Sequence, residues 1–180
     1  MGLILHLLKP KDRSVGVVHV IERLDYHQGF LPLKNAAVQF VTAAISLLSG
    51  HSVGREGPSI HLGAAAGSSL GRSLRVPNNS VRILVGCGVA AAIAAAFNTP
   101  LAGVIFAMEV VIMDYTVIGF TPVIIAAVSA TTLTRITFGD DTAFTLPDLD
   151  INSVQELPIV AFMGVSVSYT HLTLPTILLV

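Results

Sequence analysis

The residues best suited to do chemistry in this sequence are Arg55 and Glu56, a charged pair within the turn Gly54-Arg55-Glu56-Gly57-Pro58. On either side, residues 36–54 and 59–71 contain no acidic side chain, lysine or arginine. A carboxylate at membrane depth is costly, and where one occurs it usually serves a function. The setting of Glu56 therefore predicts a functional carboxylate between two apolar segments.

The turn also predicts what that carboxylate would meet. Gly57 can adopt backbone angles closed to other residues, and Pro58 suits the first turn of a helix that begins here. The first N–H groups of a helix have no internal acceptor and lie at the positive end of its dipole, so they would point donors at an anion beside Glu56. These donors belong to Ser59, Ile60 and His61. An anion site with a competing carboxylate is the simplest interpretation, and the alternative is a surface loop whose two charges pair in solvent.

Composition indicates an integral membrane protein. The chain has 180 residues, of which 53% are hydrophobic and 12% are charged, and its mean hydropathy is +0.77. A soluble domain has about a quarter of its residues charged. Several uncharged runs approach the roughly 20 residues that span a bilayer. The net charge of −1 gives no reason to expect a nucleic-acid partner. The uncharged runs are 36–54, 83–108, 115–134 and 157–180.

Hydrophobic patterning predicts an all-α fold, with breaks at the Pro- and Asn-containing turns. Small residues recur every four positions on two of the expected helices, and in lipid such ridges mark close helix–helix contacts. They are Gly63, Gly67 and Gly71 on one helix and Gly86, Ala90 and Ala94 on the other. The expected helices cover 17–24, 36–50, 59–74, 81–97, 100–113 and 116–137.

A dinucleotide-binding motif is the main competing signal. Gly86-x-Gly88-x-x-Ala91 follows an apolar triplet, and Glu109 lies at a suitable distance to contact a ribose. The motif requires a βαβ unit, but Asn98-Thr99-Pro100 begins a further apolar helix where the second strand would stand. Helix packing is therefore favoured over an NAD-linked enzyme, and we expect no enzymatic activity and no cofactor.

The histidines show no metal-binding pattern, because none pairs at i, i+4 around a glutamate. No metal site is therefore predicted. His51 and His61 flank the Glu56 turn and are expected to be partly solvated residues at helix ends. The alternative that they line a polar vestibule remains open.

Two blocks of sequence resemble the CLC family of chloride channels and chloride/proton antiporters. The first is the turn at 54–58 followed by Gly63 and Gly67. The second is Ala94-Ala95-Ala96-Phe97-Asn98-Thr99-Pro100-Leu101-Ala102-Gly103, with Glu109 beyond it. The resemblance runs from about residue 16 to residue 164.

The resemblance implies a polytopic membrane fold of tilted and broken helices, built from two inverted repeats per subunit, with one pore in each subunit of a homodimer. It assigns Glu56 as the gating carboxylate, which occupies an anion position and swings out when protonated. Gly16 matches the start of the first pore segment. The residues expected to contact the anion are Gly54, Arg55, Gly57, Pro58, Ser59, Ile60 and Gly16. The expected partners are chloride or a similar anion, the lipid bilayer and a second subunit.

Three departures from the family pattern modify this expectation. Val15 stands where the family has a chloride-coordinating serine, so backbone N–H groups near Gly16 or the hydroxyl of Ser14 would serve instead. Val110 stands where the antiporters carry the acid of the internal proton relay, which favours passive conduction over exchange, although Glu109 could compensate. The second inverted repeat and the first helices have no counterpart in this chain.

We therefore expect residues 1–165 to form a partial CLC-type transmembrane domain, and residues 166–180 to be a foreign or unstructured tail. The predicted function is a voltage- or pH-gated anion channel in a bacterial inner membrane. The alternatives are a chloride/proton antiporter and a membrane module that packs without transporting.

Overall fold

The computed structural model describes residues 16–51, 53–113, 116–139, 157–159 and 161–166. The chain forms two compact units, residues 1–143 and residues 144–180. In the second unit, the described residues are helical, where the sequence predicted an apolar segment beginning at Leu157. The expected tail lies outside the described residues except for Ser166, the last residue of that helical stretch.

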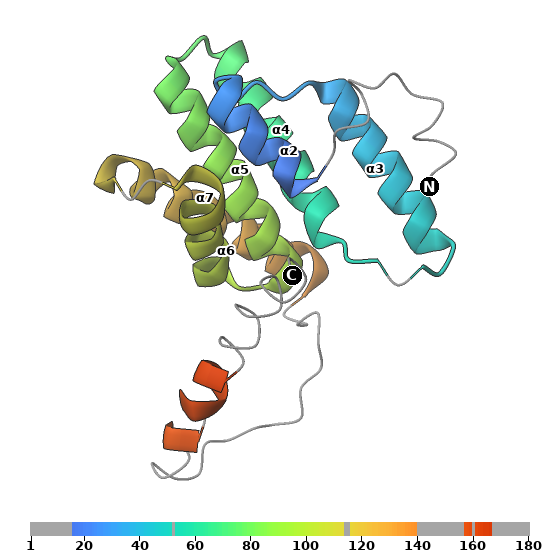
Figure 1. Ribbon diagram of the computed structural model, residues 1–180, viewed down its shortest axis with the longest axis vertical. Coiled ribbons are helices and arrows are strands. Elements are labelled where there is room, and N and C mark those ends of the chain that lie inside the picture. Colours follow the sequence, from blue (N-terminus) through green and yellow to red (C-terminus); the bar gives the residue numbers. More distant parts are fainter. Residues whose placement is uncertain (1–15, 52, 114–115, 140–156, 160, 167–180) are drawn as a thin grey trace, which may run out of the picture. The chain divides into compact units, whose positions relative to one another are not determined.

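The first unit is built from helices alone in its described part, which confirms the predicted all-α class (Figure 1). Every predicted helix is present, and each end lies within three residues of the expected position. The predicted helix over 100–113 divides into an α-helix and a π-helical turn. The elements are α2 (Val17–Tyr26), α3 (Leu33–Leu48), α4 (Glu56–Ser73), α5 (Asn78–Phe97), α6 (Pro100–Phe106), the π-helix η2 (Ala107–Ile112) and α7 (Val117–Phe138).

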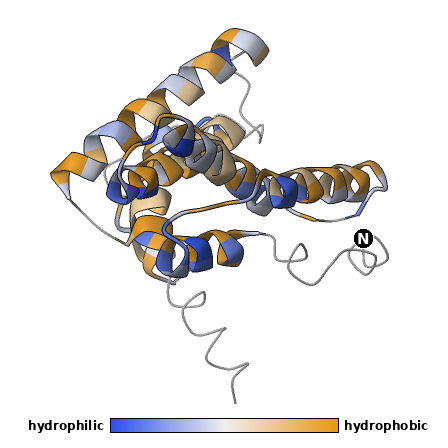
Figure 2. Ribbon diagram, turned by 90° about the horizontal axis from the view of Figure 1, so that it is seen from above, coloured by the Kyte–Doolittle hydropathy of each residue, from blue (hydrophilic) through white to orange (hydrophobic). Residues whose placement is uncertain are grey.

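Helix α5 is the centre of this unit, and it packs against α4, α6, η2 and α7. It is 20 residues long and α7 is 22 residues long, and both are apolar enough to cross a membrane. Hydrophobic residues occur along all the helices, with the hydrophilic residues in short stretches (Figure 2). The predicted membrane-type helices are therefore present, with α3 and the segment 100–112 as shorter apolar helices.

The predicted ridge of small residues on α4 packs against α5, whereas the ridge of Gly86, Ala90 and Ala94 on α5 faces η2 and α6. A Cβ atom added to Gly63 would overlap the carbonyl oxygen of Gly88, and one added to Gly67 would overlap that of Leu84. The backbones of the two helices thus touch, as small residues permit in lipid. Gly86 faces the side chain of Ile112 in the same way. The glycines of the dinucleotide motif therefore serve helix packing.

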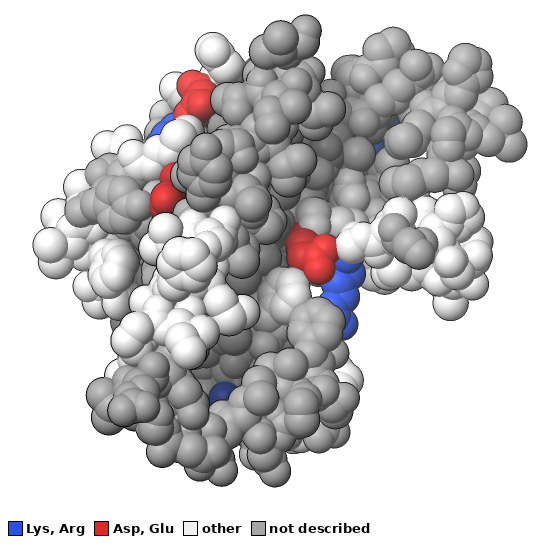
Figure 3. Space-filling model, turned by 60° about the horizontal axis from the view of Figure 1, so that its bottom comes forward, with Lys and Arg blue, Asp and Glu red and all other residues white. Residues whose placement is uncertain are grey.

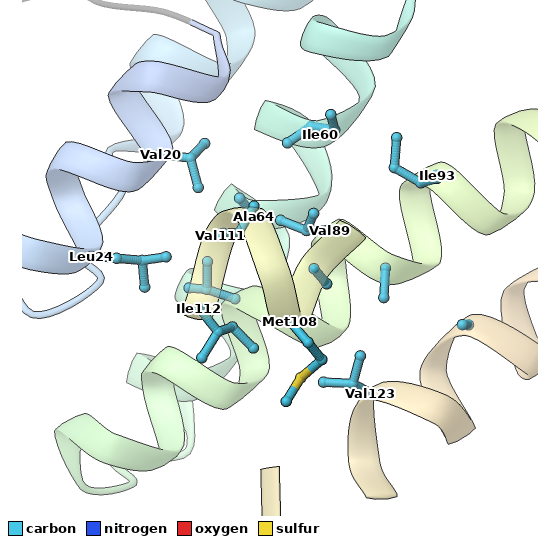
Figure 4. Packing of buried hydrophobic residues seen from close by; sticks show 14 of the residues in the cluster. Val20, Leu24, Ile60, Ala64, Val89, Ile93, Met108, Val111, Ile112 and Val123 are labelled. Carbon is cyan, nitrogen blue, oxygen red and sulfur yellow. The ribbon is translucent and has the colours of Figure 1, made fainter. Parts of the chain in front are cut away.

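One hydrophobic core joins α2, α4, α5, η2 and α7 (Figure 4). Each of these elements contributes branched or small apolar side chains that are almost fully buried. The labelled members are Val20 and Leu24 from α2, Ile60 and Ala64 from α4, Val89 and Ile93 from α5, Met108, Val111 and Ile112 from η2, and Val123 from α7. This core fixes the short helix α2 against the longer helices.

The break between α5 and α6 is set by local chemistry. Asn98 ends α5 in the left-handed conformation, with φ of 57°, which asparagine tolerates better than most residues. Its side-chain oxygen accepts a hydrogen bond of 2.7 Å from Nε of Arg135 on α7. Pro100 then begins α6, where its missing N–H costs nothing. The predicted helix break at this turn is confirmed.

Candidate anion site

Helix α4 begins earlier than its predicted start at Ser59. Arg55 is the residue before the first turn, and Glu56, Gly57 and Pro58 make up that turn. The N–H of Ser59 donates to the carbonyl oxygen of Arg55 at 3.0 Å, so it is not available to an anion. The prediction that Ser59, Ile60 and His61 supply free donors is wrong, because the helix already begins at Glu56 and Ile60 and His61 are its fifth and sixth residues. By position, the N–H groups without an acceptor inside the helix are those of Glu56 and Gly57.

The Glu56 side chain folds back toward the start of its own helix. A Cβ atom added to Gly54 would overlap Oε2 of Glu56, so the carboxylate lies against the backbone of Gly54. Glu56 is half-buried and Gly54 is exposed. The negative charge is therefore held at the positive end of α4, where the helix dipole favours an anion.

The Arg55 side chain reaches α5. Its Nη2 donates to the carbonyl oxygen of Ala96, at 2.8 Å, in the last turn of that helix, where carbonyl groups lack internal partners. The hydroxyl of Ser59 donates to the carbonyl oxygen of Arg55 at 2.8 Å. Arg55 and Ser59 also line an open cavity of about 640 Å³, together with residues from α5 and α7. One donor of Arg55 is thus engaged in joining α4 to α5.

Gly16 precedes α2 with φ of +90°, a conformation open to glycine and strained for other residues. Its carbonyl oxygen accepts the N–H of Val20 at 3.3 Å. The N–H groups of Val17, Val18 and His19 then lie in the first turn, without acceptors inside the helix. Ser14 and Val15, the predicted hydroxyl donor and the departure from the family pattern, lie outside the described residues.

Two contacts show that α2 and α4 run in the same direction. Near the start of both helices, Nδ1 of His19 lies 3.0 Å from Nε2 of His61. Farther along α4, and just beyond the end of α2, the hydroxyl of Ser68 donates to the carbonyl oxygen of Gly29 at 2.6 Å and accepts a hydrogen bond from the N–H of Leu31 at 3.1 Å. The two helix N-termini therefore lie at the same end of the pair.

The distance of each N-terminus from the histidine contact follows from helix geometry. His19 is three residues beyond Gly16, and His61 is five residues beyond Glu56. At 1.5 Å per residue these separations are about 4.5 Å and about 7.5 Å along the helix axes. The predicted site residues Gly16 and Glu56 are 40 positions apart in the sequence. They nevertheless stand at the N-terminal ends of two parallel helices, each less than two turns before the histidine contact.

His61 differs from its sequence interpretation. It was predicted to be partly solvated or to line a vestibule, but it is fully buried and its ring stacks on His19. His51 is exposed, as predicted. Sequence reasoning overlooked the pair because the two histidines stand 42 positions apart. The usable signal was that His61, Ala65 and Ser68 share one face of α4.

Glu109 and Val110 lie on the π-helix η2 that continues α6, and both are exposed. Single π-helical turns within α-helices occur often at functional sites. Asp114, the other acid expected near this helix end, lies outside the described residues. Among the described residues on the face in Figure 3, acidic and basic side chains appear in a few separate places.

The carboxylate at the start of α4 and the parallel course of α2 and α4 belong to a known family. Residues 1–172 match the family model described as voltage gated chloride channel. The chain belongs to this family, the CLC family. The resemblance found in the sequence is therefore confirmed over nearly the whole chain, and CLC proteins are integral membrane transporters of anions.

Relatives of known name agree with this assignment. A ClcB-like protein of Ralstonia nicotianae is 34% identical over 85% of this chain and 36% of its own length. The H(+)/Cl(−) exchange transporter ClcA of Vibrio cholerae is 32% identical over 89% of this chain and 35% of its own length. The crystal structure of a slow cyanobacterial Cl−/H+ antiporter matches with a TM-score of 0.71 and 26% identity, over 90% of this chain and 39% of the other. This chain thus spans just over a third of the length of each of these three relatives.

Proposed function

We propose that the complete protein transports chloride or a similar anion across a membrane, and that Glu56 is its gate. The observation that carries the proposal is the Glu56 carboxylate folded onto Gly54 at the N-terminus of α4, at the same end as the N-terminus of α2. In transporters built from broken helices, half-helix N-termini point at the bound anionic group. In this site the carboxylate takes the place of an anion.

The proposed gating follows from electrostatics. While ionised, the Glu56 carboxylate is attracted by the free N–H groups of Glu56 and Gly57 and competes with chloride for them. Protonation removes its charge, and the neutral side chain then yields the position to the anion. Arg55 holds the end of α4 against α5 through Ala96. Ser59 supplies part of the wall of the site, with Gly54 and Pro58 shaping the turn, whereas Ile60 belongs to the hydrophobic core.

The test of the gate is anion flux at several pH values. The complete protein is reconstituted in vesicles loaded with chloride, and efflux is measured for the wild type and for Glu56→Gln. We expect most of the pH dependence of efflux to disappear in this variant. Glu22→Gln, which removes an exposed carboxylate from α2, is the matched control and should keep it. Efflux from Glu56→Gln with unchanged pH dependence would exclude Glu56 as the gate.

The finer mechanism that we propose is passive conduction without obligatory proton exchange. It rests on Val110, whose side chain offers no proton-binding group where CLC antiporters carry an acid. Crossing the membrane core without titratable groups costs a proton several kcal/mol or more. The second candidate is chloride/proton exchange, which the names of the Vibrio and cyanobacterial relatives favour, with exposed Glu109 as the internal acid.

The internal pH of vesicles separates these two candidates. A chloride gradient is imposed across vesicles that contain the complete protein, and internal pH is followed by fluorescence. Passive conduction predicts no uphill proton movement. Proton movement at a fixed ratio to chloride would establish exchange instead. A complete protein that moves no anion under any condition would favour the third candidate, a membrane module that packs without transporting.

The proposed setting is a homodimer in a bacterial inner membrane. Helix α7 exposes large apolar side chains along its length, and Ile118, Ile136 and Phe138 are each about four-fifths exposed. Such a surface is stable against lipid or against another apolar helix. Cross-linking of the complete protein in native membranes, compared at increasing dilution in detergent, tests the dimer.

A further inference from the structure

Arg23, His19 and His61 form a hydrogen-bonded chain that joins α2 to α4. Nε of Arg23 donates to Nε2 of His19 at 3.1 Å, and Nδ1 of His19 lies 3.0 Å from Nε2 of His61. The ring centroids of the two histidines are 5.3 Å apart. His19 is 3% exposed and His61 is fully buried. The anion mechanism uses neither ring.

The donors in this chain fix which ring nitrogens carry protons. An arginine can only donate, so Nε2 of His19 must be the accepting, unprotonated nitrogen. Nδ1 of neutral His19 then carries the hydrogen and donates to Nε2 of His61. Neutral His61 in turn carries its hydrogen on Nδ1, an atom that is buried and has no hydrogen-bond partner among the described residues. Both rings are therefore in the Nδ1–H form.

No ring nitrogen of the two histidines can take up another proton while the hydrogen bonds from Arg23 to His19 and from His19 to His61 are both in place. A proton added to Nε2 of His19 would face the N–H of Arg23, and one added to Nε2 of His61 would face the N–H of His19. The two remaining nitrogens already carry hydrogens. Since histidine ordinarily gains its charge between about pH 5 and pH 8, acidification must either leave the pair neutral or break a hydrogen bond of the chain.

The surrounding charges do not supply a counter-ion for a doubly protonated pair. The charged or titratable groups that act on His19 are Arg23, Glu22 and His27, all on α2, and His19 itself acts on His61. Glu22 is the negative member, and it is exposed. The other charged residues on α2, on α4 and on the helices that pack against them lie at helix ends or are exposed: Asp25 on α2, Lys34 on α3, Glu56 and Arg72 on α4, Arg82 on α5 and Glu109 on η2. Oδ1 of Asp25 lies 3.9 Å from Nη2 of Arg82.

We propose that Arg23, His19 and His61 form a proton-sensitive joint, which holds α2 against α4 while both rings are neutral and opens when the pair takes up a proton. The joint lies within about two turns of Gly16 and Glu56, so its opening loosens the two helix ends from each other. It responds to pH through groups other than Glu56. The argument for the joint depends only on the contacts among these three side chains, and not on whether the complete protein transports anions.

The first test reads the protons directly. The chain is labelled with ¹⁵N-histidine, purified in detergent, and the ring nitrogens are followed by NMR from about pH 8 to about pH 5. We expect His19 and His61 to be neutral Nδ1–H tautomers that resist protonation while their contact lasts. An Nε2–H tautomer at either ring, or protonation of both rings without loss of their contact, would refute the joint.

The second test reads the coupling to packing. If a histidine can bind a proton only when the joint is open, the closed state becomes less stable as pH falls. The ratio of closed to open protein then drops by up to about tenfold per pH unit for each such proton. The melting temperature of the wild-type chain should therefore fall on acidification. In His61→Gln, whose amide oxygen still accepts from His19, the fall should be smaller, while the exposed control His27→Gln should resemble the wild type. Equal falls in all three proteins would overturn the proposal, and the NMR test decides it if His61→Gln does not fold.

Discussion

Replacing Gly54 by alanine should displace the Glu56 carboxylate from the start of α4. An added Cβ would overlap Oε2 of Glu56, and the obstructing atom is the end of a flexible side chain. The carboxylate therefore swings away while the backbone stays in place. Gly57→Ala is the matched control three positions along, because a Cβ at Gly57 meets no atom within 4 Å.

The magnitude follows from what the displaced carboxylate loses. A carboxylate at a helix N-terminus gains about 0.3 to 1 kcal/mol from the dipole, and up to about 2 kcal/mol when partly buried. Glu56 is half-buried, so about 1 to 2 kcal/mol is the appropriate range. Since about 1.4 kcal/mol corresponds to a factor of ten, Gly54→Ala should reduce occupancy of the closed position by about fivefold to thirtyfold.

The assay is chloride efflux from vesicles at neutral pH, where in the proposed gate the carboxylate of the wild type occupies the site. Gly54→Ala should raise efflux and flatten its pH dependence, whereas Gly57→Ala should leave both as in the wild type. Alanine in place of Gly57 also favours the helix, by up to about 1 kcal/mol, so its melting temperature should not fall. Matching efflux from the two variants would refute the placement of the carboxylate against Gly54.

Two further predictions concern packing and are checked by thermal melting of the chain in detergent. Gly67→Leu should lower the free energy of unfolding by more than the roughly 1 to 3 kcal/mol of ordinary overpacking, because the obstacle is the backbone of Leu84. Ala66→Leu, at an exposed neighbouring position, is the control and should be nearly neutral. A normal melting temperature for Gly67→Leu would mean that α4 and α5 do not touch there. Asn98→Ala should lower the free energy of unfolding by about 1 to 2 kcal/mol, because alanine resists the left-handed conformation. Asn98→Gly should be closer to the wild type in stability. The opposite order of the two variants would contradict the left-handed backbone at residue 98.

Most of the fold could be predicted from the sequence because its signals are local. Uncharged runs mark the membrane helices, and Asn98-Thr99-Pro100 marks the break before α6. Small residues four positions apart predicted that α4 and α5 each make a close helix contact, but not which helix each would meet. The π-helix η2 had no such signal, since its 107–112 stretch reads as an ordinary continuation of α6.

The site was harder to predict in detail because its contacts are distant in sequence. The importance of Glu56 followed from one carboxylate in an apolar setting. The start of α4 was misplaced because Pro58 is acceptable anywhere in a first turn, and the structure puts it third. The contact of His19 with His61 depends on how α2 lies against α4, which no pattern within either segment records.

The contact between α4 and α5 has a mechanical consequence for any movement of the gate. Gly63 lies against the carbonyl group of Gly88, and Gly67 lies against that of Leu84. The backbone of each helix is therefore in direct contact with the backbone of the other. Sliding by a fraction of a turn would drive a methyl group or a larger side chain into a carbonyl oxygen, so the next permitted register is a full turn away, about 5.4 Å. Helix α4 therefore has no small axial displacement open to it along α5. Glu56 must turn about its own side-chain bonds, or α4 and α5 must travel together as one rigid body.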